Sequence, residues 1–252
     1  ESLEGYRQAA SRLGVPLYLG ESGENNTEWY TAMFPLCERL NIGWSFWSYK
    51  KMACENSPVT FARPAGWDAL MEHIGSGAAM PKEKAQRIFD EFLSCISTPI
   101  FNNRVIGALT RTPPFALPCE AFDESRILSE RIPGAKLRLR EKASLIFCDG
   151  HSGEPDYRRL KGEAQPQSEN IVVRLYQDDE IRFFVRTISA PTCVRFWVFG
   201  DGLSEVRCND ALLTCKREAE GVYGFRMNGI GENVLAVRCT EKSVDADFLE
   251  FI

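Results

Sequence analysis

The pattern of apolar residues changes character near Thr112-Pro113-Pro114, and this change constrains the fold more than any other feature. Downstream of it, short apolar runs repeat with turn residues between them, as strands do. Eight such runs lie at 171–176, 180–185, 194–199, 203–208, 212–216, 222–227, 234–239 and 247–252. Short strands at this spacing are typical of an antiparallel sandwich or jelly roll. We therefore predict an antiparallel, jelly-roll-like β-sandwich over residues 115–252.

Residues 1–114 instead combine short apolar runs with helical periodicity. Apolar residues recur at helical spacing in the first 13 residues and in the ranges 27–40, 67–74, 82–96 and 105–109. The apolar runs at 16–19 and 42–49 flank the second of these ranges. A strand that is followed by a crossover helix and another strand returns as a parallel neighbour. The upstream part is therefore predicted to be α/β, with two parallel strands around the helix at 27–40.

Two motifs lie where these predicted strands end. The first is Gly20-Glu21-Ser22-Gly23, and the second is the run Gly-Trp-Ser-Phe-Trp-Ser-Tyr-Lys at 43–50. Because neighbouring strands lie about 5 Å apart, we expect Glu21 and Trp47 to open on the same side. A carboxylate can attack an anomeric carbon, and an indole ring can stack on a pyranose. The pattern favours a sugar site over the alternative of a solvated turn glutamate beside a core tryptophan.

These motifs, in this order and at this spacing, resemble the seventh and eighth strand ends of glycoside hydrolase family 5, the cellulase-like (β/α)8 barrels. The resemblance implies that residues 1–114 are the C-terminal part of such a barrel, acting on β-linked glucans or related polysaccharides without a catalytic cofactor. It implies that Glu21 is the catalytic nucleophile, that Trp47 stacks on the substrate, and that Lys50 and Trp29 reach the substrate.

A barrel of this kind needs about 250 residues, so the resemblance covers only its last part. The missing N-terminal part of the same barrel would carry the general acid/base glutamate, which retaining hydrolysis requires. We therefore expect this chain to be inactive alone and its intact parent to be a glycoside hydrolase. The expected partner is a polysaccharide or oligosaccharide substrate.

The downstream domain carries a second resemblance. The stretches 117–123, 231–238 and 245–251 are similar to the opening and the last two strands of family 6 and family 35 carbohydrate-binding modules. The resemblance implies a structural calcium at Glu120 and Asp247, since calcium prefers oxygen ligands. Trp197 and Tyr223 are the first candidates for sugar binding. In the alternative reading their rings are core residues, and the sandwich is a non-catalytic accessory that braces the barrel.

An esterase is the rival enzyme class, because Gly20 to Glu24 resembles the nucleophile elbow Gly-x-Ser-x-Gly. The fifth position is Glu24 rather than glycine. The chain has two histidines, His73 in a predicted helix and His151 in a glycine-rich loop, and neither position suits a triad. Two histidines also disfavour a catalytic metal held by imidazoles.

Charge and cysteine content exclude several classes of partner but allow two cellular locations. The net charge of −5 argues against nucleic acid, and no apolar run reaches the roughly 20 residues that span a membrane. The nine cysteines include no Cys-x-x-Cys pair, so a zinc site has no support. Cys208 and Cys215 could face each other across a hairpin, but free thiols are favoured. Unpaired cysteines indicate a cytoplasmic location, whereas the family resemblance implies an extracellular one.

Overall fold

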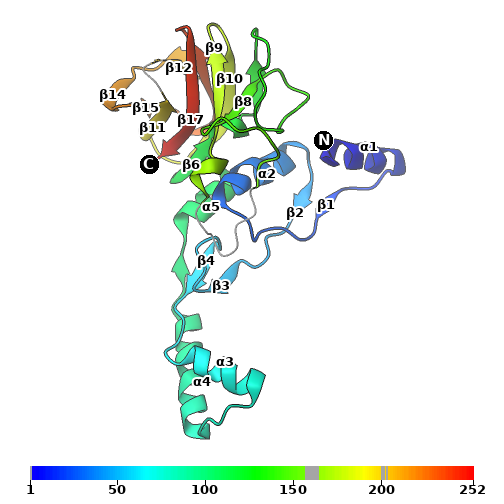
Figure 1. Ribbon diagram of the computed structural model, residues 1–252, viewed down its shortest axis with the longest axis vertical. Helices are drawn as coiled ribbons and strands as arrows, with labels where there is room; N and C mark the ends of the chain where they lie inside the picture. Colours follow the sequence, from blue (N-terminus) through cyan, green and yellow to red (C-terminus); the bar gives the residue numbers. More distant parts are fainter. Residues whose placement is uncertain (1, 157–164, 200–201, 203) are drawn as a thin grey trace.

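The computed structural model describes residues 2–156, 165–199, 202 and 204–252. Two antiparallel sheets form a sandwich from residue 115 onwards, and helices α2 (Thr27–Arg39) and α5 (Asn103–Thr110) lie directly beneath it (Figure 1). The predicted β-sandwich is therefore confirmed. Among the described residues, no helix is both long and apolar enough to cross a membrane.

The larger sheet has seven strands in the order β14-β15-β11-β17-β9-β8, with β6 also paired to β17. All of its pairings are antiparallel, and β17 changes partner from β9 to β6 along its length. Its strands are β6 (Phe115–Pro118), β8 (Ser144–Phe147), β9 (Ile171–Tyr176), β11 (Thr192–Phe199), β14 (Lys216–Ala219), β15 (Val222–Met227) and β17 (Ser243–Phe251).

The smaller sheet has five strands in the order β13-β12-β16-β10-β7. Alternate residues of both sheets point inward, so that β10 and β16 each present every second side chain to one core. The predicted strand 212–216 is in fact divided between β13 and β14, and Leu203 of the predicted strand 203–208 lies outside the described residues. The strands of this sheet are β7 (Glu124–Arg126), β10 (Glu180–Thr187), β12 (Ser204–Cys208), β13 (Ala211–Leu212) and β16 (Gly231–Cys239).

The predicted strand, helix, strand unit is confirmed. After α1 (Ser2–Leu13), strand β1 (Tyr18–Leu19) pairs in parallel with β2 (Gly43–Trp44), and α2 connects them. The tryptophan run does not continue as one strand. β3 (Lys50–Met52) instead pairs with β4 (Val59–Phe61) in a separate sheet that β5 (Ile100–Phe101) completes. The described residues hold these short strand pairs, and the larger barrel stays a prediction.

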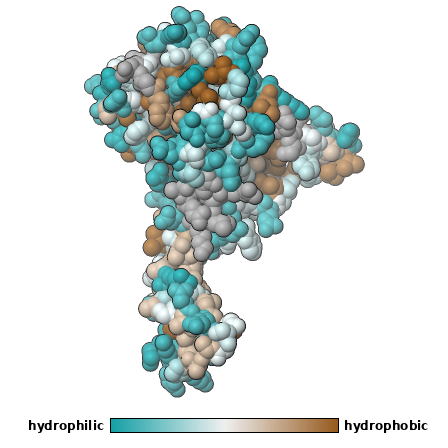
Figure 2. Space-filling model, in the orientation of Figure 1, coloured by the Kyte–Doolittle hydropathy of each residue, from teal (hydrophilic) through white to brown (hydrophobic). Residues whose placement is uncertain are grey.

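Helices α3 (Trp67–Ser76) and α4 (Lys82–Ser97) form an arm that projects away from the sandwich (Figure 1). Trp67 stacks on Phe92 with ring centroids 4.9 Å apart, which holds the two helices together. Ile74, Phe89 and Leu93 remain exposed, and the arm shows mixed apolar and polar surface in Figure 2. Both helices agree with the predicted ranges 67–74 and 82–96.

A buried ion pair joins the upstream helices to the sandwich. Arg111, at the end of α5, is 3% exposed and pairs with Asp123, whose side chain is 1% exposed. The Arg111 guanidinium also donates to the carbonyl of Thr31 in α2 at 2.9 Å and to that of Phe184 in β10 at 3.1 Å. Arg39 of α2 contacts the same carboxylate. One carboxylate of the sandwich thus fixes α2 and α5 against it.

Candidate functional site

The loops that carry Glu21 and Trp47 lie together at the ends of β1 and β2. The Trp47 amide donates to the Ser22 carbonyl at 2.6 Å, and the Ser45 hydroxyl donates to the Gly20 carbonyl at 2.6 Å. The Ser22 hydroxyl in turn donates to the Ser45 carbonyl. Glu21 is exposed, and Trp47 is 61% exposed. These hydrogen bonds hold together two loops, one with an exposed carboxylate and the other with an exposed indole.

Gly23 allows this close approach of the two loops. Its φ is +106°, and a Cβ at this position would lie 2.2 Å from the Trp47 carbonyl oxygen. Only glycine avoids both the strain and the clash. The next residue, Glu24, pairs with Lys51 at 2.7 Å, which ties the same loop to β3.

A second layer of hydrogen bonds supports these loops from beneath. The Tyr30 hydroxyl accepts from the Asn25 amide at 3.1 Å and donates to the Asn56 carbonyl at 3.2 Å. The Asn56 side chain donates back to the Asn25 carbonyl at 2.7 Å. Burial raises the pKa of Tyr30 to about 12, so the hydroxyl keeps the proton that it donates. Sequence reasoning missed this network, because its members are ordinary loop and helix residues.

Lys50 and Trp29 lie away from the Glu21 loop. The Lys50 ammonium donates to the Ile96 carbonyl at the end of α4 at 2.6 Å, and it lies 5.9 Å from the centre of the Phe61 ring. Lys50 therefore contacts the arm in this structure, and its place beside the substrate stays a prediction. Lys51 is the lysine that contacts the loop after Glu21. Trp29 lies on α2 and faces the sandwich.

Glu120 and Asp247 lie in one region of the sandwich. Asp247 falls where β17 leaves β9 and begins to pair with β6, and the 3-10 turn η1 (Cys119–Ala121) with Glu120 follows β6 directly. Burial raises the pKa of Asp247 to about 6. Both carboxylates also act on Cys119, whose pKa is raised first by burial and then by their charges.

These two carboxylates supply only part of a calcium site. Calcium takes about six to eight oxygen ligands. Within the part of the chain that the structure describes, no three His, Cys, Asp or Glu side chains form a group that could hold a metal. Backbone carbonyls and water would have to supply the remaining ligands. The structural calcium therefore stays a prediction, with Glu120 and Asp247 as its side-chain ligands.

The two candidate sugar-binding aromatics of the sandwich face opposite ways. Trp197 is half-buried and stacks on Phe248 across the strand pair, with centroids 5.2 Å apart and ring planes 15° apart. Arg195, two residues earlier on the same face, pairs with Glu218 at 2.9 Å. Tyr223 is 6% exposed and belongs to the core. The prediction of Tyr223 as a platform is wrong, because its strand register points the ring inward.

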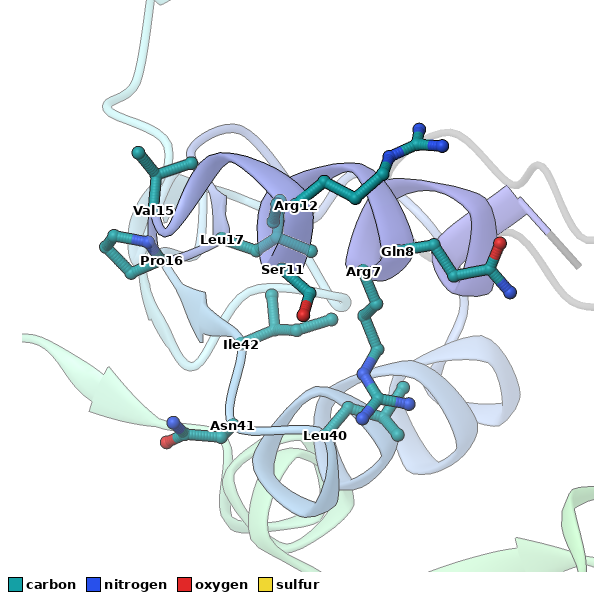
Figure 3. Close-up of a pocket in the computed structure, with 11 residues that line it drawn as sticks. Arg7, Gln8, Ser11, Arg12, Val15, Pro16, Leu17, Leu40, Asn41 and Ile42 are labelled. Carbon is teal, nitrogen blue, oxygen red and sulfur yellow. The ribbon is translucent and has the colours of Figure 1, made fainter.

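A cavity of about 590 Å³ lies between α1 and the end of α2 (Figure 3). Figure 3 shows Arg7 reaching from α1 toward Leu40, whereas Gln8 and Arg12 point away. Residues 15–17 and 40–42, which precede β1 and β2, line this cavity. It therefore lies at the amino ends of the strands, opposite the end that carries Glu21.

The two histidines do not support an esterase. The His73 ring contacts the Ala78 carbonyl beyond the end of α3. His151 lies in the sandwich, 2.6 Å from Asp149, and stacks on Phe147. The Ser22 hydroxyl is committed to the Ser45 carbonyl. These contacts place the three residues in separate surroundings.

No protein-family model matches the chain, and a search of curated proteins finds no match. Among solved structures, the chain is similar to CsCBM6-3 from Clostridium stercorarium in complex with cellobiose, at 11% identity and a TM-score of 0.37, covering 56% of this chain and 95% of that one. It is similar to a family 6 carbohydrate-binding module from Clostridium cellulolyticum in complex with xylose, at 11% identity and a TM-score of 0.36, covering 56% and 98%. A third likeness is to the CBM36-1 domain of a multidomain xylanase from the hindgut metagenome of Trinervitermes trinervoides, at 12% identity and a TM-score of 0.27, covering 44% and 96%. At TM-scores below 0.5 these likenesses do not define the function of the chain. None of the three is a family 5 glycoside hydrolase, so that resemblance stays a prediction.

Proposed function

We propose that residues 115–252 are a non-catalytic accessory β-sandwich of a polysaccharide-degrading protein, which braces the upstream helices and binds carbohydrate. The observation that carries the bracing role is the buried contact of Asp123 with Arg111 and Arg39. A buried carboxylate held by two guanidiniums is costly to assemble and fixes a single geometry. Such a contact suits a domain that supports its neighbour.

Carbohydrate binding by the sandwich is supported by the outer face of the larger sheet. Trp197 offers a ring that its stacking on Phe248 holds flat, and Arg195 and Glu218 supply polar groups beside it. An aromatic ring that is fixed in place loses little freedom when a pyranose stacks on it. The sequence resemblance at 231–238 and 245–251 agrees with this role.

Gel retardation in soluble β-glucans and xylans tests the binding. We expect the 252-residue chain to be retarded and Trp197→Ala to lose most of the retardation. Leu212→Ala, which removes a side chain 62% exposed on the other sheet, is the matched control and should migrate like the unmodified chain. Equal retardation of all three proteins would contradict binding at Trp197.

A second candidate function is the catalytic end of a retaining β-glycanase, because exposed Glu21 and exposed Trp47 lie on two loops that hydrogen bonds join. In this role Glu21 would attack the anomeric carbon while the sugar ring stacks on Trp47. A retaining enzyme also needs a general acid/base about 5 Å from its nucleophile. That group would come from an upstream part of the barrel, so residues 1–252 alone should not hydrolyse glucans.

The glycanase proposal is tested in the longer parent protein. Glu21→Gln in the parent should abolish hydrolysis of soluble β-glucan while the variant still binds the polymer. Full hydrolysis by Glu21→Gln would exclude Glu21 as the nucleophile. Turnover of β-glucan by the 252-residue chain alone would contradict the need for an upstream acid/base.

A further inference from the structure

A groove of about 810 Å³ separates α2 from the sandwich, and neither resemblance accounts for it. One wall is a face of α2, the other is the segment 136–141, and the floor is the stretch 118–123 around η1. Sites for small molecules have volumes of about 300–1,000 Å³ and occur often where two domains meet. The groove satisfies both conditions.

The α2 wall is a stripe of apolar side chains that the hydrophobic cores cover only in part. Trp29, Ala32, Met33 and Leu36 follow one another at the spacing of a single helix face. All four are half-buried, whereas the other face of α2 is fully buried in the core. The Trp29 ring contacts Phe34 edge-on at 5.8 Å, which holds the indole in place. A rigid indole therefore stands at one end of an apolar stripe.

The opposite wall carries polar groups of both signs. Arg138 lies over the Phe122 ring at 3.6 Å, donates to the Phe122 carbonyl at 2.8 Å, and pairs with Glu141 at 2.9 Å. Lys136 stands exposed at the rim. Basic and acidic side chains line the whole groove in equal numbers, five of each. An even balance gives no preference for an anion or a cation.

We infer that this groove binds a neutral β-linked oligosaccharide, with one pyranose stacked on Trp29 and its hydroxyls facing Arg138, Glu141 and Lys136. Sugar hydroxyls both donate and accept hydrogen bonds, so a wall of mixed donors and acceptors matches them. The apolar stripe matches the carbon-bound hydrogens of the ring faces. The inference rests on the proposed carbohydrate function, and it adds a site that is separate from Trp197.

Titration calorimetry of the complete 252-residue chain with cellohexaose tests the site, and α-linked maltohexaose is the control ligand. Ala32→Tyr places a ring in the groove and removes no large core side chain. We expect Ala32→Tyr and Trp29→Ala to weaken cellohexaose binding about tenfold or more. Lys136→Ala changes only an exposed side chain, so it should fold normally and weaken binding roughly fivefold. Leu212→Ala, which removes an exposed side chain of the other sheet, is the matched control and should leave cellohexaose binding unchanged.

The outcomes separate this site from the proposed function. Unchanged affinity in both Ala32→Tyr and Lys136→Ala overturns the groove as a sugar site. If Trp197→Ala alone abolishes binding, the inference fails while the proposed function stands. If cellohexaose binds to no form of the chain, the inference and the proposed sugar binding fail together. Equal affinity for maltohexaose overturns the β-linked class.

Discussion

Replacing Arg111 by methionine is the most direct perturbation of the contact between the upstream helices and the sandwich. Methionine keeps much of the side-chain length and removes the charge and all of the donors. The substitution leaves the Asp123 carboxylate in place, still accepting from the Phe184 amide at 2.6 Å and from Arg39. It also leaves the carbonyls of Thr31 and Ala121 without their guanidinium donor.

The burial of both partners sets the size of the effect. Burial lowers the pKa of Arg111, and the neighbouring Asp123 charge acts in the opposite direction. Removal of one partner of a buried ion pair costs about 3–5 kcal/mol, because the other charge stays buried. Domains of this size have unfolding free energies of about 5–15 kcal/mol. We therefore expect Arg111→Met to remove about a fifth or more of the stability.

Urea denaturation followed by circular dichroism measures the loss. Arg63→Met is the matched control, because Arg63 pairs with Asp68 through side chains that are 48% and 81% exposed. An exposed pair contributes about 0–1 kcal/mol. A double-mutant cycle of Arg111→Met with Asp123→Leu should show a coupling energy of about 1–3 kcal/mol. Equal losses in Arg111→Met and Arg63→Met would refute the structural role of the buried pair.

Three further predictions concern Gly23, Trp47 and Asp247. Gly23→Ala should lower the unfolding free energy in urea by roughly 1–3 kcal/mol more than Gly77→Ala. Both glycines have positive φ, but of the two only Gly23 would place its Cβ against a backbone oxygen. Equal losses would exclude the close approach of Gly23 to Trp47. Trp47→Ala should change the unfolding free energy by less than about 0.5 kcal/mol, because the Trp47 ring is exposed. Trp44→Ala removes a ring whose centroid lies 4.5 Å from that of Phe34, so it should lower the unfolding free energy by about 2–3 kcal/mol. A larger loss in Trp47→Ala than in Trp44→Ala would contradict this packing. Burial raises the pKa of Asp247 from 3.8 to about 6, so the folded protein holds a proton that the unfolded chain releases, and stability falls by roughly 2–3 kcal/mol as the pH rises through this window. Asp247→Asn should therefore be more stable than the unmodified chain above pH 6 and equally stable below about pH 4. Calcium chloride should raise the melting temperature of the unmodified chain but not that of Asp247→Asn. Stability curves of the two proteins that run parallel at every pH and calcium concentration would rule out both effects.

The elements predicted from the sequence are those with a long, regular pattern. The helix at 82–96 repeats its apolar residues over four turns, and the strands at 171–176 and 180–185 are rich in β-branched and aromatic residues. Strands β6, β7 and β8 were not predicted. β6 ends on a proline, and β7 has three exposed polar residues that read as a loop. Strand β6 pairs with β17, β7 with β10 and β8 with β9, and no local pattern records these tertiary contacts.

The sequence predicted the position of a site residue only where the order of strands and helices determines that position. The loops of Glu21 and Trp47 meet because the carboxyl ends of parallel strands lie at one edge of a sheet, and this follows from the strand, helix, strand order alone. The roles of neighbouring residues depend on the strand register. Side chains alternate between the two faces of a strand, and a shift of one residue exchanges the faces, so the alternation alone does not fix which residue points where. Lys50 and Lys51 are adjacent, yet one contacts α4 and the other the Glu21 loop. Tyr223 faces the core for the same reason.

Helix α2 links the sandwich to the loops that carry Glu21 and Trp47. The helix begins six residues after Glu21, and Tyr30 in its first turns holds the Asn25 and Asn56 backbone beneath the site loops. Its Thr31 carbonyl accepts from Arg111, which the sandwich holds through Asp123. The sandwich therefore fixes the helix that supports the loop of Glu21. Weakening of the Arg111 contact should consequently loosen the position of Glu21 as well as lower the stability, since the same helix carries both sets of bonds.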